Sequence, residues 1–307
     1  MKSLFFSLRP APPFRLDLTA WALRRRPENA VDVWDGRTYR RVLVVKGKPL
    51  LVEVIQTGTA VAPRLRVTIA GPKLDSSLKP AVVRALNRLL GTGVDLAEFY
   101  RLAAQDKKLR PLVERFRGVK PPRFPTMFEA LINGIACQQF SLAAGIQMLN
   151  RLAENFGLAI EEIEPRVHAF PRPEDLAGLK PESIRRLGFN RQKACAMIEL
   201  SRALVERRLN FERVATLMDD EAVKCLDQLP GVGRWTAEYA LLRGLGRLHI
   251  FPSDDVGARN GLQRWLRLRK SPDYHGVQRV LAKWRPYAGF IYFHLLLNGL
   301  DEAGNLR

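Results

Sequence analysis

A Gly-rich turn and a pair of aspartates are the residues of this chain whose types and spacing suggest chemistry. The turn is segment 229–233 (LPGVG), and an apolar segment with helical character follows it directly. Pro230 fixes φ at the entrance of the turn, while Gly231 and Gly233 allow positive φ and let a phosphate approach without a Cβ clash. Backbone amides at the start of the next helix would then point at the anion. The turn therefore predicts a phosphate-binding site.

The aspartates Asp254 and Asp255 follow Phe251 and Pro252. A carboxylate near a bound phosphate backbone could stabilise a cation developing on a sugar, or orient a water molecule. Aspartate is also a favoured helix N-cap, so both residues could simply cap the helix expected at 256–268. The two readings are compatible if Asp254 is the structural member of the pair.

The elements that must position these residues are two short helices joined by the turn. Helices are expected at 220–228 and 234–244, so that the pattern is helix, hairpin, helix. A phosphate contact made by this turn would position the protein on DNA without reading its sequence. The alternative is an ordinary helix–helix turn, since glycine and proline occur in many of them.

The charge balance favours a polyanionic partner. The chain has 50 basic and 31 acidic residues, a net charge of +19. Such a surface binds nucleic acid through phosphate contacts and counterion release. A basic surface that only serves solubility or heat adaptation is the alternative. Segment 291–297 is too short to span a membrane, and segment 1–13 lacks a convincing signal peptide. We therefore expect a cytoplasmic protein associated with the nucleoid and no membrane partner.

The cysteines and histidines indicate no metal site. Three cysteines, without CxxC spacing, exclude a disulfide framework or a four-thiolate site within one chain. They are expected to be reduced, buried and apolar in role. The four histidines show no metal-ligand spacing.

The remaining pattern predicts a small α/β unit followed by helices, an α+β fold. Residues 1–72 contain one helical segment and three segments rich in β-formers: 17–26, then 39–46, 50–56 and 64–69. Further helices are expected at 80–90 and 96–102, and from about residue 105 the chain is nearly all helix. We accordingly place a domain boundary between residues 72 and 73.

Several of these segments match one family. LPGVGRWTAEYALLRG with FPSDD resembles the helix-hairpin-helix DNA glycosylases, and the 3-methyladenine DNA glycosylase II branch in particular. PTMFEALINGIACQQFSLAAG resembles that family's helix pair around a loop that enters the duplex, and segments 170–204 and 283–287 are also similar. The resemblance is specific over about residues 120–300 and weaker over 1–72.

The resemblance implies a fold as well as an activity. Residues 1–72 would form the small TATA-binding-protein-like α/β domain of that branch. Residues 73–307 would form a mostly helical glycosylase bundle, with two helical subdomains, the active-site cleft between them and the hairpin at about 220–244.

The resemblance also implies roles for individual residues. Asp255 would be the catalytic aspartate, and Gly231 and Gly233 the phosphate-binding glycines. Other residues expected to bind DNA are Arg234 and Thr236 of the hairpin helix and Gln138, Gln139 and Phe140 of the upstream loop. Gln139 stands where a wedge leucine fills the gap left by a flipped base, so Gln139 or Phe140 would take that place.

Three aromatic residues, Trp235, Tyr239 and Tyr287, would line the base pocket. Alkylated purines such as 3-methyladenine and 7-methylguanine carry positive charge, which aromatic faces attract. A charged purine also leaves readily, so no acid is needed to protonate it. Core packing is the alternative role for each of these rings.

Two absences shape the expected chemistry. Relatives that also cut the strand carry a Schiff-base lysine two residues after the last hairpin glycine, where this chain has Trp235. No cysteine follows Cys225, so the iron–sulfur cluster of some relatives is not expected. No cofactor is implied, although a monovalent cation could bridge the hairpin and a phosphate.

The sequence thus predicts a monofunctional DNA glycosylase of base excision repair. It would act as a monomer on double-stranded DNA containing damaged bases, flip out an alkylated purine, hydrolyse its N-glycosidic bond and leave an abasic site. One alternative is a glycosylase for hypoxanthine, uracil or oxidised guanine. Another is a non-catalytic helix-hairpin-helix DNA-binding protein, although such a protein would need neither Asp255 nor the aromatic residues. Whether Asp255 acts electrostatically or as a general base stays open at this point.

Overall fold

The N-terminal part of the chain folds into a five-stranded antiparallel sheet. The structure, a computed structural model, describes residues 2–72, 74–161 and 166–306. The strand order is β1-β5-β4-β3-β2, with every neighbouring pair antiparallel. The strands are β1 (Lys2–Leu8), β2 (Val33–Trp34), β3 (Thr38–Val45), β4 (Lys48–Gln56) and β5 (Leu65–Gly71). Strands β3, β4 and β5 confirm the β-rich segments, whereas β1 and β2 were not predicted.

Alternation of side chains gives the sheet its buried face. In β5, Leu65, Val67 and Ile69 are fully buried while Arg66 between them is exposed, as the period-two pattern predicts. This face packs against α1 (Leu16–Arg24) and α2 (Lys79–Leu90), which share one apolar core with the strands. Because α2 lies beyond residue 72 and still packs on the sheet, we propose that the N-terminal unit extends through α2.

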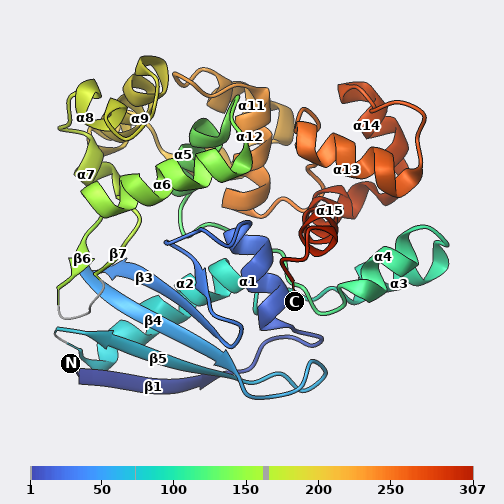
Figure 1. Cartoon of the computed structure of the whole chain (residues 1–307), viewed down its shortest axis with the longest axis horizontal. Helices are drawn as coiled ribbons and strands as arrows, with labels where there is room; N and C mark the ends of the chain where they lie inside the picture. Colours follow the sequence, from blue (N-terminus) through green and yellow to red (C-terminus); the bar gives the residue numbers. More distant parts are fainter. Residues whose placement is uncertain (1, 73, 162–165, 307) are drawn as a thin grey trace.

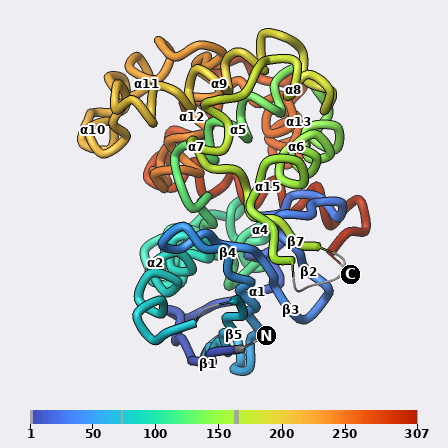
Figure 2. The backbone as a smooth tube through the Cα atoms, turned by 90° about the vertical axis from the view of Figure 1, so that its left-hand side faces the viewer, coloured from blue at the N-terminus to red at the C-terminus, as the bar shows by residue number. Residues whose placement is uncertain are grey.

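The rest of the chain is helical, and its helices lie on one side of the sheet in two perpendicular views (Figures 1 and 2). A short hairpin of β6 (Ala159–Ile160) and β7 (Val167–His168) returns to the sheet. The helices of the first group are α5 (Met127–Cys137), α6 (Leu142–Phe156), α7 (Pro173–Leu176), α8 (Pro181–Arg185), α9 (Arg191–Val205), α10 (Phe211–Thr216), α11 (Asp219–Asp227) and α12 (Arg234–Ala240). Those of the second group are α3 (Ala97–Gln105), α4 (Leu109–Arg115), α13 (Val256–Leu266), α14 (Tyr274–Leu281) and α15 (Ala288–Glu302).

The two groups have separate apolar cores. The first core is continuous with that of the sheet, and the second is built around α3, α4, α13, α14 and α15. We propose that these cores correspond to the two helical subdomains expected from the sequence. In the described residues no helix combines the length and the apolar character needed to cross a membrane.

Side-chain caps begin the helices that carry the site. The hydroxyl of Ser141 accepts a hydrogen bond from the amide of Ala144, so Ser141 is the N-cap of α6. Asp255 caps α13 in the same way. Thus Asp255 is the N-cap of α13. The expectation that Asp254 is the structural residue of the pair is corrected.

Candidate active site

The Gly-rich turn joins α11 to α12, close to the predicted bounds. Gly231 has a φ of +73°, and a Cβ there would lie 2.6 Å from the Cβ of Ala196. Gly233 caps α12 with a φ of −101°, so only Gly231 of the two glycines uses the left-handed region that the sequence suggested for both. Gly233 is exposed, and a Cβ there would meet no atom within 4 Å. The turn therefore leaves open space in front of the first amides of α12.

A glutamine fixes the turn to the loop that follows α5. Nε2 of Gln138 donates to the carbonyl oxygen of Gly231 at 2.8 Å and to Oγ1 of Thr236 at 2.7 Å. Thr236 is completely buried. The prediction that Thr236 binds DNA is therefore corrected, because its hydroxyl is enclosed and holds the loop instead. Gln138 likewise has a structural bond to the hairpin.

The tip of this loop presents Gln139 and Phe140 to solvent. Gln139 has a φ of +57°, and the side chain of Phe140 is 44% exposed. Below the tip, Nζ of Lys193 donates to the carbonyl oxygens of Ala136 at 3.0 Å and Gln138 at 2.5 Å. The same ammonium lies 4.1 Å from the ring centroid of Phe140. Lys193 thus holds both the end of α5 and the exposed aromatic ring.

Asp255 has its carboxylate fixed by three donors. Oδ1 accepts from the amide of Ala258 at 2.8 Å, and Oδ2 accepts from Nε1 of Trp235 at 3.3 Å and from the hydroxyl of Tyr292 at 3.0 Å. Asp254 pairs instead with Arg259 at 3.3 Å. Of the two aspartates, only Asp255 is hydrogen-bonded to the aromatic residues of the site.

These aromatic residues line a cavity of about 670 Å³. The rings of Trp235 and Tyr239 stack with centroids 5.5 Å apart and an interplanar angle of 30°. Asp255 and Tyr292 also line this cavity, as do Gln138, Gln139 and Phe140 of the loop. Burial raises the pKa of Tyr239, and burial together with Asp255 raises that of Tyr292 well above the usual value. Both phenols therefore stay neutral near pH 7.

The structure does not bring Tyr287 to this cavity, which corrects its assignment to the base pocket. Its ring packs 5.2 Å from that of Phe99, on α3, in the second apolar core. Tyr292, further along α15, supplies the aromatic ring and hydroxyl instead. In the sequence Tyr292 lies within an apolar helical segment, and nothing there distinguishes it from a core residue.

Arg234, at the start of the second hairpin helix, is exposed, and its side chain packs on an aromatic ring. The guanidinium of Arg234 lies 4.7 Å from the ring centroid of Tyr274. Tyr274 in turn donates its hydroxyl to Glu238 at 2.7 Å. Arg234 thus lies at the surface beside the open space in front of Gly233.

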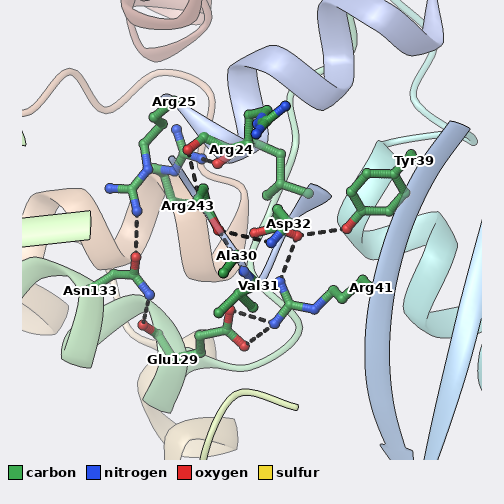
Figure 3. A network of polar contacts seen from close by, with 12 residues as sticks. Arg24, Arg25, Ala30, Val31, Asp32, Tyr39, Arg41, Glu129, Asn133 and Arg243 are labelled. Carbon is green, nitrogen blue, oxygen red and sulfur yellow. Dashed lines mark hydrogen bonds and ion pairs between the residues drawn. The ribbon is translucent and has the colours of Figure 1, made fainter. Parts of the chain in front are cut away.

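A buried polar network that was not predicted from the sequence joins the sheet to this site (Figure 3). Arg41 on β3 donates to Asp32 at 2.8 Å and to Glu129 on α5 at 2.6 Å. Arg25, directly after α1, donates to the hydroxyl of Tyr239 at 2.8 Å and to Oδ1 of Asn133 at 2.5 Å. The sequence signal was a run of arginines, 24–26, at the end of an apolar helix, which contributed only to the charge count.

The cysteines differ from expectation in their burial. All three carry free thiols, but Cys195 is exposed and Cys137 and Cys225 are half-buried. Cys195 lies on the outer face of α9, where its side chain is not needed for packing. The expectation of a buried apolar role is therefore wrong for Cys195, whereas Cys137 and Cys225 are partly buried and pack against the first apolar core.

Comparison with known proteins gives a family and several relatives. A family model described as HhH-GPD superfamily base excision DNA repair protein matches residues 132–286. DNA-3-methyladenine glycosylase of Bacillus subtilis (strain 168) is 25% identical over 265 residues, 86% of this chain and 83% of the relative.

Among solved structures, the 3-methyladenine DNA-glycosylase of Archaeoglobus fulgidus has a TM-score of 0.81 at 26% identity, covering 97% of this chain and 98% of its own. The 3-methyladenine DNA glycosylase Mag1 of Schizosaccharomyces pombe, solved in complex with abasic DNA, has a TM-score of 0.56 at 26% identity. It covers 66% of this chain and 95% of its own. The first match extends over the sheet and both helical groups, and the second over a smaller part.

Proposed function

Because the chain belongs to the HhH-GPD superfamily of base excision DNA repair proteins, we propose that it is a monofunctional DNA glycosylase for alkylated purines. Its substrates are bases of the 3-methyladenine and 7-methylguanine type in double-stranded DNA. The reaction is hydrolysis of the N-glycosidic bond, and the product is an abasic site. The observation that carries this proposal is the Asp255 carboxylate, held by Trp235 and Tyr292 against an aromatic cavity beside the hairpin.

The chemistry assigned to Asp255 follows from its charge. When the bond between C1′ and the purine nitrogen breaks, its electron pair leaves with the base and the sugar develops oxocarbenium character. A carboxylate fixed beside that sugar stabilises the cation without having to reorganise. The oxygen of a water molecule then bonds to C1′, and its proton goes to solvent or to the carboxylate. An alkylated purine that leaves is already positively charged, so it departs neutral and needs no acid.

Binding of the flipped base is assigned to the stacked pair Trp235 and Tyr239. An aromatic face attracts a cation by about 0.5–2 kcal/mol, depending on desolvation. The half-buried indole of Trp235 also donates to Asp255, so the base-binding ring and the catalytic carboxylate are in direct contact. A base stacked on this indole therefore places its glycosidic bond close to Asp255.

We assign binding of the DNA to the hairpin and to the loop after α5. The open amides that follow Gly233 fit a phosphate group, and the exposed guanidinium of Arg234 adds positive charge beside them. Gln139 and Phe140 are the exposed tip of the loop and would fill the space left by the flipped base. These contacts offset the cost of unstacking, a few kcal/mol.

Absence of strand cleavage is part of the proposal. At the place where a lyase of this superfamily has its lysine, this chain has Trp235, and an indole forms no imine. Among the described residues that line the cavity there is no lysine. The enzyme should therefore stop at the abasic site.

The test is to incubate the protein with methylated duplex DNA and identify the released bases by chromatography. Release of methylpurines, with strand breaks only after alkali or heat, supports the proposal. DNA binding without release of any base would favour a non-catalytic binding protein. Release from duplexes with hypoxanthine, uracil or oxidised guanine, but not from methylated DNA, would assign another lesion. Strand breaks without alkali would refute the monofunctional mechanism.

A further inference from the structure

The cavity has a charged side chain from the N-terminal part of the chain, Arg25. This residue follows α1, has a φ of +64° and is only 4% exposed. α1 packs against α2 and β2 on one side and α15 on the other. Its C-terminal turn thus carries Arg25 into the cavity that Trp235 and Asp255 line. The roles proposed above for base binding and hydrolysis do not use this residue.

The guanidinium of Arg25 is fixed by neutral partners. Nη1 donates to the hydroxyl of Tyr239 at 2.8 Å, and Nη2 donates to Oδ1 of Asn133 at 2.5 Å. The ring centroid of Phe124 lies 5.5 Å from its Cζ. Nε has no hydrogen-bond partner among the described residues. A guanidinium carries only N–H donors and no acceptor. The part of the cavity wall formed by Arg25 therefore offers hydrogen-bond donors only.

Among the described residues no carboxylate is hydrogen-bonded to this guanidinium. Asp32 and Glu129 are both hydrogen-bonded to Arg41 instead (Figure 3). A second buried arginine, Arg243, donates to backbone carbonyl oxygens of α1 and lies 5.7 Å from the ring of Tyr239. Arg25 and Arg243 thus flank the deep side of Tyr239, and the described hydrogen bonds of both guanidinium groups go to neutral partners.

Purines differ in the hydrogen-bonding group at C6 that they would present to the donors of Arg25. A 6-oxopurine presents an acceptor at O6, which arginine commonly contacts in guanine; in 7-methylguanine N7 carries the methyl group, so O6 is the acceptor that remains at this edge. A 6-aminopurine presents an N–H donor at the same place, so that two donors face each other there. We propose that Arg25 is a specificity-determining residue that makes this site favour 6-oxopurines, such as 7-methylguanine and hypoxanthine, over 6-aminopurines, such as 3-methyladenine. This inference rests on the glycosylase function proposed above.

Methylated DNA offers a test within one sample. Both 3-methyladenine and 7-methylguanine are cationic and are released from the same DNA, but one has an amino group and the other an oxo group at C6. The measurement is the ratio of the two single-turnover release rates in wild type and in Arg25→Gln. The variant should lower the ratio of the 7-methylguanine rate to the 3-methyladenine rate about tenfold, the low end of what one hydrogen bond to a charged group contributes. An unchanged ratio would overturn the inference.

The control is Arg66→Gln, which removes one positive charge from the exposed face of β5, on the sheet. It should leave the ratio as in wild type, and an equal drop in this variant would also overturn the inference. If wild type releases neither methylpurine, the proposed function fails instead, so the two failures are distinguishable.

A second measurement needs no variant and decides the matter if Arg25→Gln does not fold. Free hypoxanthine and free adenine have the same ring system and differ in the oxo or amino group at C6 and the hydrogen at N1. The free base is added while the wild-type protein releases methylpurines from DNA. The concentration of hypoxanthine that halves the release rate should be about tenfold lower than that of adenine. Equal inhibition, or stronger inhibition by adenine, would refute a preference for 6-oxopurines.

Discussion

Replacing Asp255 with asparagine tests the central assignment because it removes a charge and little else. Asparagine is as good an N-cap as aspartate, so its oxygen can still accept from the amide of Ala258, now at 2.8 Å. The amide nitrogen would then face Trp235 and Tyr292. The phenol can turn its hydrogen and accept, but the indole N–H is left without an acceptor, at a cost of about 1 kcal/mol for a half-buried donor. The variant should fold and melt slightly below wild type.

The expected loss of activity follows from the charge. A carboxylate about 4 Å from a full positive charge, at an effective dielectric constant of about 20, contributes about 4 kcal/mol. The transition state carries only part of that charge. Since about 1.4 kcal/mol corresponds to a factor of ten, the release rate should fall about a hundred- to a thousandfold. Affinity for undamaged DNA should change little, because Asp255 makes no proposed backbone contact.

The assay is single-turnover release of methylpurines with enzyme in excess over DNA, at fixed pH and salt. The matched control is Asp254→Asn, because Asp254 is the neighbouring acid and pairs with Arg259 at a partly exposed position. We expect this control to stay within about threefold of wild type, as exposed ion pairs contribute little. Asp255→Asn within tenfold of wild type, or Asp254→Asn losing as much, would refute the role of Asp255.

Three further changes test the surroundings of the site. Tyr292→Phe removes a donor that fixes Asp255, so release should slow about tenfold with unchanged DNA affinity; a rate equal to wild type would contradict this positioning role. Lys193→Met removes the donor that holds the carbonyls at the end of α5, so the loop tip should loosen. Fluorescence of 2-aminopurine opposite a lesion should then report less base flipping, and an unchanged signal would show that the loop does not need this anchor. Burial lowers the pKa of His294 to about 4. The unfolded chain then binds more protons between about pH 4 and 6.5, and stability is lost as the pH falls through this range. In urea unfolding at pH 7 and 5, His294→Phe should reduce the acid-induced loss by about 2 kcal/mol, and an equal loss in both proteins would contradict it.

The elements that follow local rules were predictable from the sequence. The alternation of Leu65, Val67 and Ile69 within segment 64–69 predicted β5. The hairpin was predictable because Pro230 restricts the backbone at the start of the turn and Gly231 permits the positive φ that the turn uses. Strand β1 was missed because its segment, rich in phenylalanine and leucine, lacks clean alternation, and pairing with β5 across the sheet defines it.

What the sequence could not supply are contacts between distant residues. Gln138 and the turn are 93 positions apart, and Arg25 and Tyr239 are 214 apart. No periodicity reports such pairs, since they depend on how whole elements pack. The same limit explains Tyr287, which directly precedes α15: the residue near this helix that meets the cavity depends on how α15 packs against α3 and α13, and that packing selects Tyr292.

The fixed geometry of Asp255 favours an electrostatic role over that of a general base. An ionised carboxylate has about four lone-pair positions, and here donors from Ala258, Trp235 and Tyr292 occupy three of them. A general base must accept and release a proton at an oxygen that faces water, whereas Oδ2 already accepts two hydrogen bonds from the walls of the cavity. A charge held by three donors needs no rearrangement as the sugar becomes cationic. The capping bond of α13 therefore also serves the site, because it uses Oδ1 and turns the other oxygen toward the aromatic residues.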